Sequence, residues 1–542
     1  MTQIERRTFL RGLGAAIALA PGVSLLSAGT ARARASADLR LTRIDRSLLV
    51  TAEEARAWHA VKDSMGGPTI AGSPSWRNFL ELCERELRAC GVVDVFRNPW
   101  RYSRWSTTEW PDDSAWSLRI GDNEVRVASY GCNSGDTSEN GVTGQLVLYE
   151  EGMSAEALRG KIAVVVKRPP TGPVPRADAP ANASPSAQGG NVRTGDYEFL
   201  SDPDTFSDPQ VPRTEGGRLS PFGQMGLGDD REVLERAGAL GALIVLGLSY
   251  DALAGLYTFP VPPLHQLPTL YLDRGAGVAV VEAARGGESA TLRLLGRTEE
   301  SETYQLFAYL PGRHYGTERD EQILLITHTD GPSISQDNGA LGILGMVQYL
   351  SHLAQSERPR TLLVFLDCRH YMPGMERAFA SQDYAAQNPE VYQKVFAAMG
   401  IEHLGQMQVA EGQDEPYHLT STPELSTVWV TRNQRLVDWA IRAVQENRLR
   451  RVQVQCPGRP GIHGGEQGPW YGLGNIANRL GKPGISTMGS MTGYWSIRAR
   501  LDALDAGHFV DQVATMTQLC GELMLAELAR IVPADEGAPA RG

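Results

Sequence analysis

The chain has 542 residues, of which 42% are hydrophobic and 21% charged, and its formal net charge at pH 7 is −11. This length exceeds what one hydrophobic core usually supports, so we expect a soluble protein of two or more domains. The acidic balance argues against nucleic acid or an anionic membrane surface as the main partner.

The N-terminus carries a twin arginine. Residues 5–12 read ERRTFLRG, a mildly apolar stretch follows to about Gly29, and small residues alternate with arginine over residues 31–35. This pattern resembles a twin-arginine (Tat) signal peptide over residues 1–35 and predicts a periplasmic or extracellular protein. The apolar stretch is short and contains Pro21, and no other segment reaches the ~18 apolar residues of a span. We therefore expect no membrane span in the mature chain.

Residues 51–97 predict helix, glycine-rich loop, helix and a short strand. Thr51 before two glutamates fits a helix start. Residues 66–74 break that helix, because they are rich in glycine and proline. From Trp76 the apolar positions keep a 3.6-residue period up to Gly91, which predicts a second helix. Residues 92–96 then read as a strand.

From about residue 116 to 298 the pattern changes to short strands separated by turns, with the clearest strands at 144–149 and 160–166. A helix from Arg231 runs into the apolar residues 242–246. Between them, the tract 169–230 is rich in proline, glycine and serine. A connection this long is either a functional lid or disordered.

From residue 303 strands and helices alternate, as in a mostly parallel sheet covered on both faces. Apolar runs at 323–327 and 362–366 predict buried strands, and a helical pattern starts after Asp337. Residues 435–446 and 507–531 predict further helices. The fold class expected is therefore α/β, a mostly parallel central sheet flanked by helices, with an inserted β-rich domain.

Polar residues gather where these predicted strands end. His328 and Asp330 follow the first strand, Asp337 precedes the next helix, Arg369-His370 follows the second strand, and Glu402-His403 follows a third short segment. In α/β sheets the site commonly lies at the carboxyl ends of the strands. Histidine and carboxylate side chains from separate loops supply zinc ligands and leave a position open for water. A single such residue indicates little, whereas this joint placement favours a metal site.

The order of motifs resembles the co-catalytic zinc aminopeptidases, the family of glutamate carboxypeptidase and the transferrin receptor ectodomain. The stretch GPTIAGSP at 67–74 and the return AYLPG at 308–312 match that family, as does the spacing of His328 and Asp330. Residues 116–299 resemble the protease-associated domain that these relatives carry as an insertion. The resemblance implies one discontinuous peptidase-like domain, residues 50–115 plus 300–535, and a tail at 536–542.

The resemblance implies metal ligation by His328, Asp337 and Glu402, with His370 able to complete a second site, and hence one or two zinc ions. Asp330 would orient His328. The chain also departs from the family, because Asp367-Cys368-Arg369-His370 stands where the family has a Glu-Glu pair. A guanidinium stays protonated at neutral pH, so Arg369 cannot replace the base. It would instead hold a substrate carboxylate or a developing oxyanion.

The family has a further histidine late in its sequence, and Trp495 stands at that position in this chain. His463 and Glu466, in the glycine-rich segment 461–470, are the best replacements for a lost ligand and a lost base. Asp367 is the other candidate for the general base. The same segment is equally consistent with a glycine-rich turn that packs on Trp470.

The function expected is hydrolysis of an amide or peptide bond of a peptide or small amide by metal-activated water. Two alternatives stay open. One is a non-catalytic binding protein on a degenerate peptidase scaffold, favoured by Arg369 and Trp495. The other is an acyl or cyclising transferase on the same fold. The survival of His328, Asp337 and Glu402 favours the hydrolase.

Overall fold

The structure is a computed structural model that describes residues 38–167, 197–200, 230–256, 264–370, 372, 389–410, 417–456, 472–489 and 496–532. The predicted signal peptide lies outside the described residues, as do His463, Glu466, Trp470 and Trp495.

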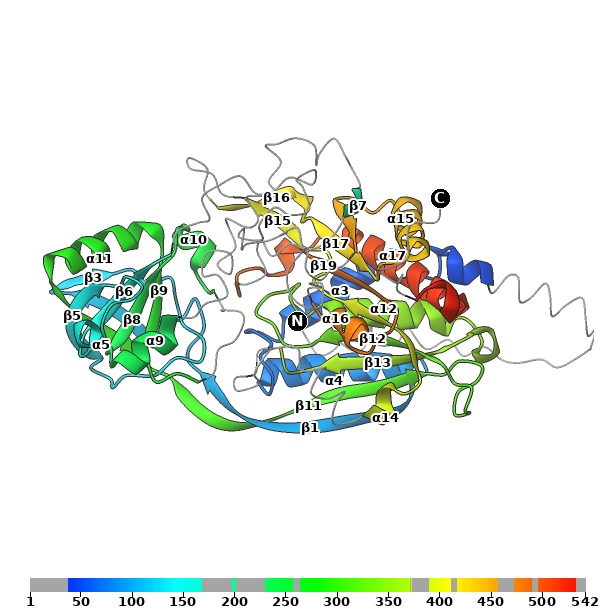
Figure 1. The fold of residues 1–542 in the computed structure, drawn as a ribbon, viewed down its shortest axis with the longest axis horizontal. Coiled ribbons are helices and arrows are strands. Elements are labelled where there is room, and N and C mark those ends of the chain that lie inside the picture. The colour runs from blue at the N-terminus through cyan, green and yellow to red at the C-terminus, as the bar shows by residue number, and fades with distance from the viewer. Residues whose placement is uncertain are drawn as a thin grey trace, which may run out of the picture.

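Two large sheets organise the chain, at opposite ends of the view in Figure 1. The main sheet has nine strands in the order β1-β11-β13-β12-β14-β19-β17-β18-β7. Their bounds are β1 (Val93–Ser106), β7 (Tyr197–Leu200), β11 (Arg297–Leu310), β12 (Gln322–His328), β13 (Thr361–Asp367), β14 (Val395–Ile401), β17 (Ser426–Val430), β18 (Val452–Gln455) and β19 (Gly484–Gly489). A separate small ribbon pairs β15 (Met407–Ala410) with β16 (His418–Pro423).

The centre of the main sheet is parallel and its margins are mixed. β13, β12, β14 and β19 run parallel to one another. β1 and β11 are antiparallel to each other, β11 is antiparallel to β13, and β17 is antiparallel to β19. The α/β class is thus confirmed, with parallel strands in the part of the sheet that holds the polar strand ends.

Helices cover both faces of the main sheet. On one face lie α3 (Ala52–Asp63), α4 (Pro74–Ala89), α12 (Gly339–Ser351), α15 (Gln434–Glu446) and α17 (Ala506–Leu525), and on the other α14 (Pro389–Tyr392) and α16 (Asn475–Arg479). Leu325 packs into the core on the first face and Leu324 into the core on the second. Burial on both faces explains why β12 and β13 read as continuous apolar runs without alternation.

Local signals place the helices that approach the polar strand ends. Thr51 and Glu54 form a capping box at the start of α3, where the sequence predicts a helix start. Ser73 caps α4 and Pro74 occupies its first turn. α12 begins at Gly339, where a Cβ atom would stand only 2.0 Å from the Ile401 carbonyl oxygen. Glycine therefore lets α12 start directly against the end of β14.

The second sheet takes its strands from residues 116–294 in the order β3-β2-β10-β5-β6-β8-β9-β4. The strands are β2 (Trp116–Ile120), β3 (Asn123–Val125), β4 (Ser129–Tyr130), β5 (Val142–Leu148), β6 (Ile162–Val166), β8 (Gly241–Val245), β9 (Thr269–Leu272) and β10 (Ser289–Leu294), and the helices are α5 (Ala155–Leu158), α9 (Asp230–Ala237), α10 (Tyr250–Leu253) and α11 (Arg274–Gly286). α11 packs on one face, and α5, α9 and α10 on the other. That this unit is a protease-associated domain stays a prediction.

A long two-stranded ribbon joins the two sheets, along the lower edge of Figure 1. β1 and β11 pair antiparallel from Val93–Tyr309 to Ser106–Arg297, with a register shift between Val93 and Phe96. The sequence predicts only a short strand at 92–96. The outer half of β1 escapes the pattern, because residues 100–106 read WRYSRWS, in which arginine and serine separate the aromatic residues and leave no continuous apolar run. The two units also touch through Arg498 Nη1, which lies 3.1 Å from Asp251 Oδ1.

Part of the tract predicted to be a lid or disordered belongs to the main sheet. Residues 197–200 form β7, which pairs antiparallel with β18. The rest of residues 169–230, apart from Asp230 at the start of α9, lies outside the described part of the chain.

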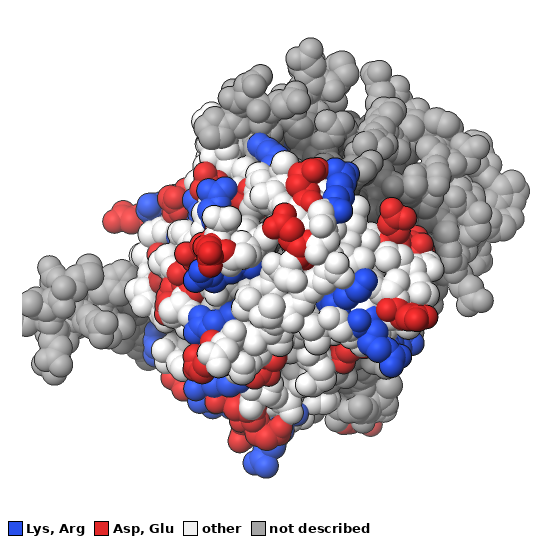
Figure 2. Space-filling model, turned by 90° about the vertical axis from the view of Figure 1, so that its left-hand side faces the viewer, with Lys and Arg blue, Asp and Glu red and all other residues white. Residues whose placement is uncertain are grey.

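The charge of the described surface and the apolar character of the described helices concern two kinds of partner, nucleic acids and membranes. On the face shown in Figure 2, acidic and basic side chains are interspersed over the described residues. The net charge of −11 does not gather there into a patch of one sign. Within the described ranges, no helix combines the length and the apolar character that crossing a bilayer requires.

Candidate metal centre

The polar strand ends meet at one edge of the parallel strands. His328 is the last residue of β12, and Asp367, the last residue of β13, is its register partner. Glu402 and His403 directly follow β14, the neighbour of β12 on its other side. The adjacent strands β13, β12 and β14 thus end at one edge of the main sheet, with His328, Glu402 and His403 at or directly after two of these ends.

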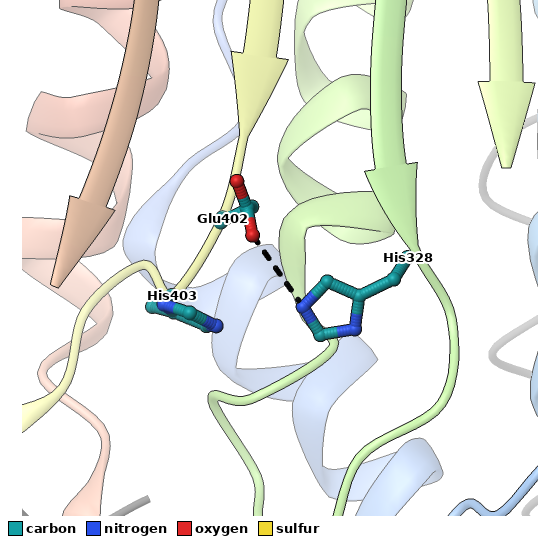
Figure 3. Close-up of side chains that lie close together, drawn as sticks. All are labelled: His328, Glu402 and His403. Carbon is teal, nitrogen blue, oxygen red and sulfur yellow. Dashed lines mark ion pairs between the residues drawn. The ribbon is translucent and has the colours of Figure 1, made fainter. Parts of the chain in front are cut away.

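Three of these residues form a compact group of potential ligands. His328, Glu402 and His403 each offer one ligating atom, and these atoms lie within 4.8 Å of one another (Figure 3). The three residues are only 1%, 2% and 4% exposed. His328 Nε2 faces Glu402 Oε2 at 3.7 Å. Two imidazoles and one carboxylate are the donor set of many catalytic zinc sites, which keep a fourth position open.

His328 is held in an orientation that suits metal ligation. Its Nδ1 lies 2.9 Å from the backbone oxygen of Asp330, so Nδ1 carries the proton that is donated there. Among the described residues nothing hydrogen-bonds its Nε2. Burial lowers the pKa of His328 to about 4, which favours the neutral imidazole that binds metals. Asp330 therefore orients His328 through its carbonyl, while its carboxylate accepts the His370 backbone N–H at 3.2 Å.

Glu402 lies against the backbone of Gly472 and Leu473. Its Oε1 accepts the Leu473 backbone N–H at 2.6 Å. Gly472 has a φ of +77°, and a Cβ atom there would stand 2.4 Å from Oε1, so only glycine leaves room for the carboxylate. Burial raises the pKa of Glu402 to about 7, opposed by the Leu473 hydrogen bond. A bound cation would stabilise the ionised carboxylate that burial disfavours.

His403 is a potential ligand that the sequence-based ligand set omits. Its φ of +56° lies in the left-handed region, which residues other than glycine seldom adopt. Successive side chains of an extended strand point to opposite faces, but this turn lets Glu402 and His403 reach the same site. Burial lowers the pKa of His403 well below its usual range. Gln336 Nε2 lies 3.4 Å from His403 Nε2.

Asp337, a predicted ligand, has other partners. The Lys62 ammonium lies 2.8 Å from its Oδ1, and the Thr69 hydroxyl donates to its Oδ2. Burial raises the pKa of Asp337, whereas Lys62 and Thr69 act in the opposite direction. Asp337 is not among the grouped ligands His328, Glu402 and His403.

His370 and Arg369 lie beside the group. The His370 ring stacks on that of His328, with centroids 4.0 Å apart and planes inclined by 18°. Burial lowers the pKa of His370 well below its usual range. Arg369 is completely buried, with its guanidinium 4.2 Å from the centre of the Trp100 ring. A substrate carboxylate could reach this guanidinium only if its surroundings moved.

Asp367 is engaged by neighbouring donors. Its Oδ1 accepts the Gln305 amide at 2.8 Å and the backbone N–H of Arg369 at 3.3 Å. The Arg369 Nε lies 3.6 Å from the same oxygen. These contacts commit Oδ1 of Asp367 to neighbouring donors, which disfavours this oxygen as the acceptor of a proton from water.

Comparison with known proteins supports the fold. No family model matches the sequence, and no curated protein sequence matches it either. Solved structures match over most of the chain. The peptidase M28 precursor of Shewanella amazonensis is 14% identical, with a TM-score of 0.58 over 93% of this chain and 99% of that one.

Two further structures agree. The zinc aminopeptidase of Bacillus subtilis is 12% identical, with a TM-score of 0.54 over 91% of this chain and 98% of that one. The aminopeptidase of Aneurinibacillus sp. strain AM-1 is 14% identical, with a TM-score of 0.52 over 93% and 100%. At such identities the match establishes architecture and not activity. The chain therefore has the fold of the zinc aminopeptidases.

Proposed function

We propose that the protein is an exported, metal-dependent hydrolase of an amide or peptide bond, with one zinc ion held by His328, Glu402 and His403. The observation that carries this proposal is the buried group of three ligating side chains at the carboxyl edge of parallel strands. Export rests on the twin-arginine pattern of residues 1–35. A peptide or small amide is the substrate class that suits this chemistry.

The chain's own residues prepare the site. Zinc bound there would polarise the scissile carbonyl and lower the pKa of a water molecule. His328 presents its Nε2 because Asp330 holds its Nδ1–H. Glu402 supplies a carboxylate whose second oxygen is held by Leu473. Burial of all three side chains excludes bulk water, which strengthens electrostatic interactions at the site.

The test is zinc content and hydrolysis of aminoacyl-p-nitroanilides by the purified mature protein. We expect stoichiometric zinc after dialysis, hydrolysis that a chelator abolishes, and loss of both in His328→Ala. His352→Ala, which removes an exposed histidine at the end of α12, is the matched control and should keep both. A wild-type protein that holds no zinc and gains no stability from added zinc would contradict the proposal.

The general base is proposed to be Glu466, because Asp367 is already engaged. Glu466→Gln should lower kcat by ~10²-fold and leave zinc content unchanged. Asp367→Asn is the comparison. If Glu466→Gln stays fully active while Asp367→Asn is dead, the base is Asp367. If Glu466→Gln loses zinc, Glu466 is a ligand.

A non-catalytic binding protein is the second candidate function. The observation that favours it is the complete burial of Arg369 against Trp100, which keeps this guanidinium out of reach of a substrate. This candidate predicts a protein that hydrolyses no aminoacyl-p-nitroanilide even when loaded with zinc. The hydrolysis assay above separates the two.

A further inference from the structure

We infer that Lys62 is a permanent counter-cation for Asp337, so that the site holds a single metal ion at His328, Glu402 and His403. The metal ion in this inference rests on the proposed function. The pairing of Lys62 with Asp337 rests on the contacts of Lys62 alone. It withdraws Asp337 from the predicted ligand set and makes Lys62 a positioning residue.

Both oxygens of the Asp337 carboxylate already have partners, an ion pair at Oδ1 and a hydrogen bond at Oδ2. Lys62 Nζ lies 2.8 Å from Oδ1 and the Thr69 hydroxyl donates to Oδ2. The side chain of Asp337 is fully buried and that of Lys62 is 5% exposed. A buried ion pair with such contacts is costly to break, because the remaining charge would stay desolvated.

Lys62 is held independently of Asp337. It lies in the last turn of α3, and its ammonium donates to the Ser333 backbone oxygen at 3.0 Å. The same ammonium lies 5.3 Å from the centre of the Phe79 ring. Three structural elements therefore fix the cation: α3, α4 and the segment that leads into α12. A side chain anchored in this way is not a loosely placed surface lysine.

The Lys62–Asp337 ion pair limits the number of metal ions that can bind beside His328, Glu402 and His403. A metal ion ligated by Asp337 would lie within a few ångströms of the Lys62 ammonium, and at ~4 Å like charges repel strongly in a buried environment. His328, Glu402 and His403 bring one negative charge when Glu402 is ionised, and Asp337 adds none once Lys62 neutralises it. One divalent ion thus suits this charge, and a second does not.

Stability variants test the pairing whether or not metal binds. In the full mature chain with EDTA, Lys62→Met should lower Tm by ~5–10 °C, because Asp337 loses its ammonium. The double variant Lys62→Met/Asp337→Asn should recover most of that loss. Lys394→Met, which removes an exposed lysine, is the matched control and should leave Tm unchanged. An unchanged Tm in Lys62→Met, or no recovery in the double variant, would overturn the pairing.

Zinc stoichiometry tests the single ion. Wild-type protein titrated with zinc alone should bind one equivalent, and the double variant should still bind one. Glu402→Ala should bind none. Two equivalents in the wild type, or loss of zinc from the double variant, would overturn the inference. If the wild type binds no zinc but the Tm shifts appear, the proposed function fails while the Lys62–Asp337 pairing stands.

Discussion

His403 combines a potential ligand with an unfavourable backbone conformation. Left-handed φ values cost non-glycine residues about 1–3 kcal/mol, and such residues gather at functional sites where the surrounding structure enforces them. Here the turn brings two successive side chains to one site, next to His328.

Two substitutions separate the strain from the ligation. In EDTA, His403→Gly should be about 1 kcal/mol more stable than His403→Ala, because glycine adopts a φ of +56° without a Cβ penalty. Both variants should lose zinc to the same extent. Urea unfolding and zinc analysis measure the two effects. Equal stabilities would show that the backbone is not strained, and retained zinc would show that His403 is not a ligand.

The residues that the sequence identifies are those at strand ends. His328 and Glu402 stand directly after apolar runs, so their meeting follows from the topology of a parallel sheet. His403 depends on a single backbone dihedral that no local pattern encodes. Lys62 reads as an ordinary residue in the last turn of a helix, and its partner Asp337 lies far along the chain. Tertiary contacts of this kind are invisible to periodicity and spacing.

The buried side chain of His59 makes the free energy of unfolding depend on pH in the acid range. His59 Nδ1 lies 2.7 Å from the Ala55 carbonyl oxygen, and its Nε2 lies 3.0 Å from Asn338 Nδ2. Burial is the main cause that lowers its pKa from 6.5 to about 3. Between these pH values the unfolded chain binds a proton that the folded chain does not. The free energy of unfolding contributed by His59 is therefore intact above pH 6.5 and declines as the pH falls towards 3.

Replacing the His59 imidazole should make the free energy of unfolding less dependent on pH. We expect His59→Gln to reduce the slope of unfolding free energy between about pH 6 and pH 4 by up to about 1.4 kcal/mol per pH unit. Urea titrations at several pH values provide the slope. His352→Gln, at an exposed position, controls for removal of an imidazole. A wild-type slope in His59→Gln would mean that His59 is protonated in the folded protein.

At the scale of elements, the contact of α12 with the strand ends depends on one glycine. A Cβ atom at Gly339 would stand 2.0 Å from the Ile401 oxygen and 2.2 Å from Thr327 Oγ1. Gly339→Ala should therefore push α12 away from β12 and β14 and lower stability by about 2–3 kcal/mol. Gly286→Ala is the control, because its Cβ would be exposed with its closest contact at 3.7 Å.

The two glycine variants are compared by urea unfolding. Gly286→Ala should change stability by no more than about 0.5 kcal/mol, since an exposed helical position tolerates alanine. Similar losses in both variants would argue that α12 adjusts without cost. Zinc affinity should also fall in Gly339→Ala, because Glu402 follows Ile401 directly.

Elements with a strong apolar pattern are predictable and the others are not. The helices at 52–63 and 434–446 and the strands β12 and β13 lie where periodicity places them. β1 is predicted far too short, because its outer half pairs with β11 through charged side chains such as Arg104 and Glu299. β7 lies in a tract whose composition suggests no strand at all. In both cases pairing with a distant strand overrides the local signal.

For the whole molecule, the ribbon of β1 and β11 predicts that the second unit is removable. Ser106 pairs with Arg297, so an Asn-Gly turn could replace residues 107–296. We expect the shortened chain to unfold cooperatively, with a Tm below that of the intact protein because contacts such as Arg498–Asp251 are lost.

A shifted junction is the control for this deletion. Joining Trp105 to the turn instead of Ser106 moves β1 by one residue and turns its buried side chains outward. Circular dichroism and thermal unfolding compare the two chains. Equal behaviour of both, or aggregation of the in-register chain, would show that residues 107–296 are needed for the main sheet to form.

The ribbon of β1 and β11 also determines when the main sheet can form during synthesis on the ribosome. β1 is the edge strand of the main sheet and its partner there is β11, which emerges roughly 190 residues later. At bacterial rates of about 5–20 residues per second, β1 waits about 10–40 s for that partner. During this interval the second unit can complete its own fold while the first helices stay undocked. The main domain is thus assembled after synthesis of the segment that interrupts it.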